Sequence, residues 1–283
     1  MENLENKILV PIDFTEHSLA GLEQSYNLAR YSKSEIVLLH VIVESKPFWG
    51  IFSSNEKDDY IERINKKLDE YIELISKKTG LKVSKIISKG KLIDSILIEA
   101  EKLKAKMIVV GTTTTTNIKQ KIVGSNALRL INEAKCPVVT LKSKHSRDKF
   151  ENIIVPLDLS KETGRKVNTA INLAKYFGGK IFAVTAVTTG VEYDLDKLRH
   201  QLYQVRKFVN DHDIECETQF IKLSGGKEKI AKSLLEYSDS VNGDIMLIMT
   251  QQEAEIVEFF IGSLAKEIIH EAKIPVMSII PKH

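Results

Sequence analysis

Three short segments of the sequence carry residues that could bind a phosphorylated ligand. Asp13 follows one short apolar run, and Gly111 and Thr112 follow another. Gly124 and Ser125 precede a segment with the spacing of a helix. A glycine lets the backbone approach a ligand closely, and the N-terminus of a helix presents free N–H groups that suit a phosphate. These residues indicate a nucleotide site, with base and sugar near Asp13 and phosphates near the two glycines.

Each of these features also has a purely structural interpretation. Asp13 could cap a turn after a strand, and Gly124 with its neighbour could be no more than the start of a helix. The hydroxyls of Thr112 and Thr114 could contact phosphate or simply occupy a polar loop. His40 is expected to face the same site from the end of a strand, and a hydrogen-bonded structural role is the better interpretation of its side chain.

The chain contains two copies of one pattern. Residues 7–19 match residues 152–164 at a constant offset of 145, and residues 133–141 match residues 271–279 at an offset of 138. Internal repetition of this kind indicates that each copy carries the same succession of secondary-structure elements.

The repeat divides the chain into two domains, which we predict over residues 1–144 and 150–283. The polar segment 142–149 between the copies is the expected linker. The second copy is seven residues shorter than the first, and the segment 45–55 has no evident counterpart in it. We therefore expect the difference in length to lie in that loop.

Each copy alternates short apolar runs with longer segments of helical spacing. Apolar positions recur three and four residues apart in the segments 92–103 and 123–134. The predicted strands are 8–12, 36–43, 83–87, 107–110 and 138–141, then 153–157, 181–187, 218–223, 245–249 and 276–280. Five strands alternating with four helices favour an α/β fold, with two tandem doubly wound parallel sheets of strand order 3-2-1-4-5. Ligands bind such sheets at the carboxyl ends of the strands, where the strand order reverses.

Several motifs resemble those of the universal stress protein family in its tandem form, over nearly the whole chain. They are ILVPIDFTEHS from residue 8, LLHV from residue 38, IVVGT from residue 108, GSNALRLI from residue 124 and CPVVTL from residue 136. The ATP-binding branch of that family carries the motif G-x2-G-x9-G-[S/T]. Gly111, Gly124 and Ser125 have its spacing, whereas Thr114 replaces the middle glycine and adds a Cβ there.

The resemblance implies that ATP, with or without Mg²⁺, binds to the first half of a regulatory stress-response protein that has no dedicated catalysis. Asp13 and Val41 would contact the adenosine part, and the glycines of the motif would hold phosphates. The residues expected around the nucleotide are Pro11, Asp13, Val41, Gly111, Thr112, Thr114, Gly124, Ser125 and Asn126. The resemblance also implies that the two halves form a pseudo-dimer through their closing strands, 138–141 and 276–280.

Two other functions remain open from the residues alone. An interaction protein with both sites vestigial would account for Thr114, and its partner would be an unknown protein. A slow ATPase would need a general base at the phosphate end, where the sequence offers no evident one. A homodimer of the whole chain also remains open.

The second copy departs from the nucleotide motif. Met249 and Gln252 take the places of the first two motif residues, and only Gly262 and Ser263 remain. Three glutamates lie between Met249 and Gly262, whereas two lysines lie in the corresponding segment of the first copy. Two unit charges about 4 Å apart interact by about 1 kcal/mol in water and about 4 kcal/mol at an effective dielectric of 20. Glutamates facing a triphosphate would oppose binding, so we expect one site, in the first half.

The composition excludes several classes of protein. The 283 residues include 41 Lys and Arg against 38 Asp and Glu, and a net charge of +3 gives no basic footprint for nucleic acid. Cys136 and Cys216 are too few for a disulfide scaffold or a cysteine zinc site. No apolar stretch approaches the roughly 18 residues of a membrane span. We expect a cytoplasmic protein that contacts neither nucleic acid nor membrane.

Overall fold

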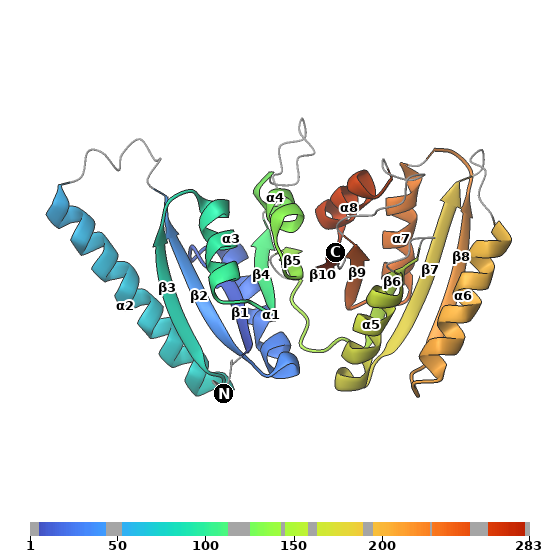
Figure 1. Ribbon diagram of the computed structural model, residues 1–283, viewed down its shortest axis with the longest axis horizontal. Helices are drawn as coiled ribbons and strands as arrows, with labels where there is room; N and C mark the ends of the chain where they lie inside the picture. Colours follow the sequence, from blue (N-terminus) through green and yellow to red (C-terminus); the bar gives the residue numbers. More distant parts are fainter. Residues whose placement is uncertain are drawn as a thin grey trace.

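Two α/β halves share one continuous sheet of ten strands (Figure 1). The computed structural model describes residues 6–43, 53–112, 125–142, 145–157, 163–188, 195–226, 228–249 and 260–280. The first half contains β1 (Asn6–Pro11), α1 (Glu16–Ser32), β2 (Ser34–Ile42), α2 (Ser54–Thr79), β3 (Val83–Lys89), α3 (Leu92–Lys102), β4 (Met107–Thr112), α4 (Ser125–Glu133) and β5 (Val138–Lys142). The second half contains β6 (Asn152–Pro156), α5 (Thr163–Phe177), β7 (Lys180–Thr188), α6 (Leu195–Asn210), β8 (Cys216–Leu223), α7 (Lys229–Ser240), β9 (Ile245–Met249), α8 (Phe260–Glu271) and β10 (Val276–Ile279).

The strand order of the sheet is β3-β2-β1-β4-β5-β10-β9-β6-β7-β8. Strands pair in parallel within each half, as β1 does with β2 and β4, and as β6 does with β7 and β9. Each half therefore has the order 3-2-1-4-5, which confirms the predicted doubly wound fold. The two predicted sheets are the halves of one mixed sheet.

The sheet is buried on both faces because helices cover each of them. Alternate residues of a strand point to opposite faces, so Ile8 and Val10 pack with α1 and α2 while Leu9 packs with α3 and α4. All three side chains are fully buried. The second half repeats this arrangement, with α5 and α6 on one face and α7 and α8 on the other. Unbroken apolar runs are typical of parallel strands covered in this way.

The halves differ in length both in a helix and in the connection before it. Helix α2 has 26 residues, whereas its counterpart α6 has 16. The connection before α2 spans residues 43–53, and the one before α6 spans residues 189–194, so it too is longer in the first half. Most of the loop 45–55 lies outside the described residues, and its share of the difference stays a prediction. Helix α2 already begins at Ser54, behind a capping box in which the side chains of Ser53 and Glu56 bind each other's backbone N–H groups.

The halves join through the antiparallel pairing of β5 and β10. Val139 lies opposite Met277 in this ladder, and both side chains are almost completely buried. The closing strand of a parallel sheet otherwise presents a row of unpaired N–H and C=O groups. The structure confirms the expectation that the two halves pack through this edge.

The segment between the halves is fastened to both of them. The backbone carbonyl of Arg147 accepts hydrogen bonds from the side-chain amides of Gln24, at 3.0 Å, and Asn27, at 2.7 Å. The Arg147 N–H donates to Gln24 Oε1 at 2.8 Å. On the other side, Arg147 Nε lies 3.6 Å from Asp244 Oδ1, and Asp244 Oδ2 accepts hydrogen bonds from the N–H groups of Glu151 and Asn152, each at 2.9 Å. These bonds hold the linker between α1 and the start of β9.

A second contact between the halves is aromatic. The ring of Tyr31, near the end of α1, meets the edge of the Tyr176 ring of α5 at a centroid distance of 5.3 Å. Phe177 lies 6.1 Å from Tyr31 and 5.0 Å from the fully buried Phe150. Figure 1 shows the lower ends of α1 and α5 on either side of the linker. Aromatic pairs of this kind add to the stability that buried area provides.

We expect Val139→Asp to lower the free energy of unfolding by at least about 3 kcal/mol, because it places an unpaired carboxylate in the junction between β5 and β10. Urea unfolding followed by circular dichroism measures the change. Leu74→Asp introduces the same charge on α2 at a side chain that is 60% exposed, and should change stability by less than about 0.5 kcal/mol. Equal stability of the two variants would show that the junction does not hold the halves together.

Candidate functional site

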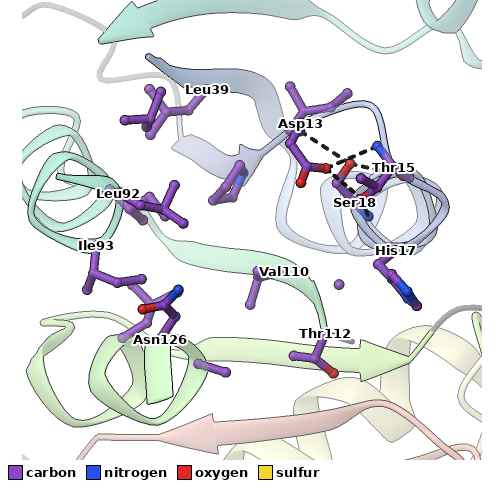
Figure 2. Close-up of a pocket in the computed structure, with 17 residues that line it drawn as sticks. Asp13, Thr15, His17, Ser18, Leu39, Leu92, Ile93, Val110, Thr112 and Asn126 are labelled. Carbon is purple, nitrogen blue, oxygen red and sulfur yellow. Dashed lines mark hydrogen bonds between the residues drawn. The ribbon is translucent and has the colours of Figure 1, made fainter. Parts of the chain in front are cut away.

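A pocket of about 270 Å³ opens at the carboxyl ends of β1, β2 and β4 (Figure 2). Helices α1, α3 and α4 supply the rest of its wall. β1 and β4 are neighbours in the sheet. β2 and β3 lie beyond β1 on one side, and β5 lies beyond β4 on the other. The pocket therefore lies where strand order reverses, which is the usual place for a ligand in a doubly wound sheet.

The structure brings six of the nine predicted site residues to this pocket. They are Pro11, Asp13, Val41, Gly111, Thr112 and Asn126. Thr114 and Gly124 lie outside the described residues, and Ser125 is described only as the first residue of α4. The role of these residues as nucleotide ligands stays a prediction.

Most of the pocket wall is apolar. The large aliphatic residues that β2, α3 and α4 contribute to it are Leu39, Leu92, Ile93, Ile96 and Leu130. In Figure 2 Leu39, Leu92 and Ile93 occupy the side of the pocket away from Thr15 and His17. The helical spacing of residues 92–103 predicted α3, but it did not indicate that the first turn of this helix faces a pocket.

Asp13 is fixed at the rim by its own turn. Its Oδ1 accepts hydrogen bonds from the Thr15 N–H at 3.0 Å and from the Thr15 hydroxyl at 2.6 Å. Partial burial alone would raise the pKa of the Asp13 carboxyl, but hydrogen bonds from Thr15 and Ser18 outweigh this effect, and the pKa lies below its usual value. The turn-capping interpretation is thus correct.

The residue after Asp13 turns away from the pocket. Phe14 has a φ of 64°, a left-handed conformation that is costly for a residue with a side chain. Its ring stacks on His40 at a centroid distance of 5.4 Å, and Lys67 Nζ lies 4.3 Å from the ring centre. This packing offsets the conformational cost and holds Asp13 at the rim.

His40 has the structural role that its sequence context suggested. Its Nδ1 lies 2.8 Å from the carbonyl oxygen of Ile12, and its side chain is buried. The expectation that it faces the site is wrong, because its strand neighbours Leu39 and Val41 line the pocket and alternate residues point to opposite faces.

Gly111 allows α1 to lie directly on the end of β4. A Cβ at Gly111 would lie 1.7 Å from the carbonyl oxygen of His17, and a Cβ at Gly21 would lie 2.7 Å from the Gly111 nitrogen. No side chain fits at either position without moving the backbone. Gly111 therefore has a packing role in addition to its place in the pocket wall.

Two polar residues, Asn126 and His17, line the pocket, and only Asn126 was predicted from the sequence. Asn126, on the first turn of α4, lies beside Ile93 at the far side of the pocket from Asp13 (Figure 2). His17, on the first turn of α1, was not predicted as a site residue. Its Nδ1 is buried and has no hydrogen-bond partner in the described part of the chain.

The second half does not reproduce this geometry. Lys166 and Met249 occupy the positions that correspond to Gly21 and Gly111 in the repeat. Both side chains are buried, at 2% exposure each, so α5 and β9 are separated by side chains where α1 and β4 touch through backbone. Asp158 and Gln252, the counterparts of Asp13 and Thr114, lie outside the described residues.

The described residues contain no group of three or more His, Cys, Asp or Glu side chains placed to hold a metal ion. No helix among them is long and apolar enough to cross a membrane. Burial raises the pKa of the Cys136 thiol to about 12 and that of Cys216 to about 11, so both thiols are protonated at neutral pH.

Two stretches of the chain match one protein-family model, whose description is "Universal stress protein family". The matches cover residues 5–142 and 149–279. The chain belongs to the universal stress protein family. It carries two tandem domains of this family, which confirms the resemblance seen in the sequence motifs.

Individual relatives are consistent with this assignment. A universal stress protein of Methanocaldococcus jannaschii is 31% identical over 149 residues, a match that covers 50% of this chain and 84% of that protein. A crystal structure of a universal stress protein from Archaeoglobus fulgidus matches 98% of each chain with a TM-score of 0.77 and 21% identity, and so has the same fold. Another universal stress protein from that organism has been solved in complex with dAMP; it is 19% identical, covers 46% of this chain and 98% of its own, and has a TM-score of 0.37.

We expect Gly111→Ala to lower the free energy of unfolding by about 3 kcal/mol or more, because the added methyl group overlaps the His17 carbonyl. Chemical denaturation measures the loss. Gly164→Ala is the matched control: nothing lies within 4 Å of a Cβ at this position of α5, and alanine favours the helix by up to about 1 kcal/mol. A Gly111→Ala protein as stable as wild type would contradict the close approach of α1 to β4.

We also expect Asp13 to contribute stability that depends on pH. Its pKa is lower in the folded protein than the ordinary value of 3.8, so the ionised carboxylate stabilises the fold above that value. The contribution should be lost as the pH falls below 3.8 and through the folded pKa. Unfolding free energies of wild type and Asp13→Asn, measured from pH 7 to pH 2.5, should converge at the acid end. A difference that is constant over this range would contradict the prediction.

Proposed function

We propose that the first half binds an adenine nucleotide, ATP in the first instance, and that the protein is a regulatory binding module without dedicated catalysis. The observation that carries this proposal is the pocket at the reversal of strand order, with an apolar wall and an acceptor at its rim. An adenine nucleotide occurs in the dAMP complex of another family member, which makes it the first ligand to test.

The size and lining of the pocket suit the nucleoside part of such a ligand. About 270 Å³ lies just below the roughly 300–1,000 Å³ of typical small-molecule pockets, so a base and sugar would fill it. The base would contact the aliphatic walls supplied by β2 and α3. Asp13 would accept from a ribose hydroxyl through Oδ2, since Thr15 donates both of its hydrogen bonds to Oδ1.

The phosphates would extend toward the first turn of α4. Helix N-termini attract anions through free N–H groups and the positive end of the helix dipole. Asn126 and Thr112 line the pocket on this side and offer an amide and a hydroxyl. A Mg²⁺ ion, when bound, would neutralise part of the phosphate charge and would be held chiefly by the phosphates.

The titratable groups at the pocket favour a binding role over a catalytic one. Among the described wall residues these are Asp13 and His17. The lowered pKa of Asp13 makes it a weak base, and its hydrogen bonds tie it to the turn. Neither group forms a nucleophile–base pair with another described residue.

Titration calorimetry with magnesium-ATP should give a stoichiometry near one per chain. Val41→Trp should weaken binding at least about tenfold, because the indole fills the pocket beside the base. Ala186→Trp is the matched control, since Ala186 holds the same repeat position in the second half and is also half-buried. We expect it to leave ATP binding unchanged.

Three results would overturn the proposal. No heat and no shift in melting temperature at millimolar ATP would favour an interaction protein with vestigial sites. A stoichiometry near two would contradict a single site in the first half. Phosphate release under multiple turnover that Val41→Trp abolishes would contradict the absence of catalysis.

A further inference from the structure

A second hollow lies at the opposite end of the first half from the candidate nucleotide pocket. It has a volume of about 550 Å³ and is lined from both halves, by Asn6, Tyr31, Ser32, Lys33 and Lys106 on one side and by Asn172, Lys175 and Tyr176 on the other. The Tyr31–Tyr176 ring contact described above crosses from one half to the other within it. Its position is the amino end of β1 and β4 and the last turns of α1 and α5.

The charged side chains that line this hollow, among the residues that the structure describes, all have one sign. Lys33, Lys106 and Lys175 are exposed, and no carboxylate of a described residue lines the hollow. None of the three lysines has an ion pair with another described residue. Lysines elsewhere do form such pairs, for example Lys85 with Asp69 at 2.6 Å and Lys273 with Asp239 at 2.9 Å.

The ends of two helices reduce this positive charge but do not cancel it. The C-termini of α1 and α5 face the hollow, and each carries about half a negative charge from the helix dipole. Lys175, in the last turn of α5, complements one of them. Three ammonium groups against about one unit of dipole charge leave about two positive charges, which matches a phosphate dianion.

Neutral donors and rings accompany the charges. The side-chain amide of Asn172 can donate to a phosphate oxygen, and the Tyr176 ring is 48% exposed. The Asn6 amide is held in place by its bond to the Ser32 carbonyl at 3.2 Å. Ammonium, amide and aromatic groups around one hollow are the chemistry that recognises a small molecule with a phosphate group and a ring.

We infer that this hollow between the two halves is a second ligand site, for a small phosphorylated molecule, and that it is independent of the candidate nucleotide pocket. A ligand there contacts residues of both halves. Its binding therefore stabilises the α1–α5 contact as well as adding to the stability of the whole chain.

The test uses inorganic pyrophosphate, without Mg²⁺, as the probe in calorimetry at low salt. Lys106→Gln/Lys175→Gln removes one ammonium group from each half and should weaken binding about tenfold. Lys78→Gln/Lys207→Gln makes the same change in charge at exposed lysines of α2 and α6, and should leave binding within about twofold of wild type. Asn172→Leu removes the amide at constant charge and should weaken binding about threefold.

The location is tested separately from the proposed nucleotide site. Val41→Trp alters the nucleotide pocket and should leave pyrophosphate binding unchanged. Absence of heat with the wild-type protein, equal losses in the two double-lysine variants, or loss of pyrophosphate binding in Val41→Trp would each overturn the inference. If Asn172→Leu binds pyrophosphate as tightly as wild type, the binding is only a non-specific attraction to the lysines. This result would also overturn the inference.

Discussion

The pairing of β5 with β10 is the interaction on which the rest of the structure depends. A five-stranded parallel sheet ends in a strand whose outer edge needs hydrogen-bond partners, and here each half supplies the partner of the other. The same pairing places α1 beside α5, so the Tyr31–Tyr176 contact and the fastening of the linker at Arg147 follow from it. The halves are thereby one folded unit rather than two domains on a flexible connection.

The two halves have the same fold but differ in how a helix packs on the sheet, namely α1 on β4 in the first half and α5 on β9 in the second. The contact of Gly21 with Gly111 lets α1 lie on β4, which shapes a pocket at the carboxyl end of the sheet. Lys166 and Met249 fill the same positions in the second half with buried side chains. The fold is therefore the same in both halves although the contact between helix and strand at this position differs.

Much of the fold could be predicted because parallel strands buried on both faces must be apolar without interruption, as in the run that contains Ile8 and Val10. The repeat then extended the prediction to the second half. The pocket wall from α3 could not be predicted, because helical spacing reports a buried face but not what covers it. The direction of His40 could have been inferred from its neighbour Val41. The bonds between Gln24 and Arg147 join residues 123 positions apart, and no local pattern signals them.

The fastened linker has a consequence for how the halves meet. Separate domains pair to an extent that depends on their concentration, whereas a short tether keeps the partner surface at an effective concentration of the order of millimolar. The hydrogen bonds of Gln24 and Asn27 to Arg147 further restrict the conformations that the linker can adopt. Dilution therefore does not dissociate β5 from β10, and the junction persists at whatever level the protein is present.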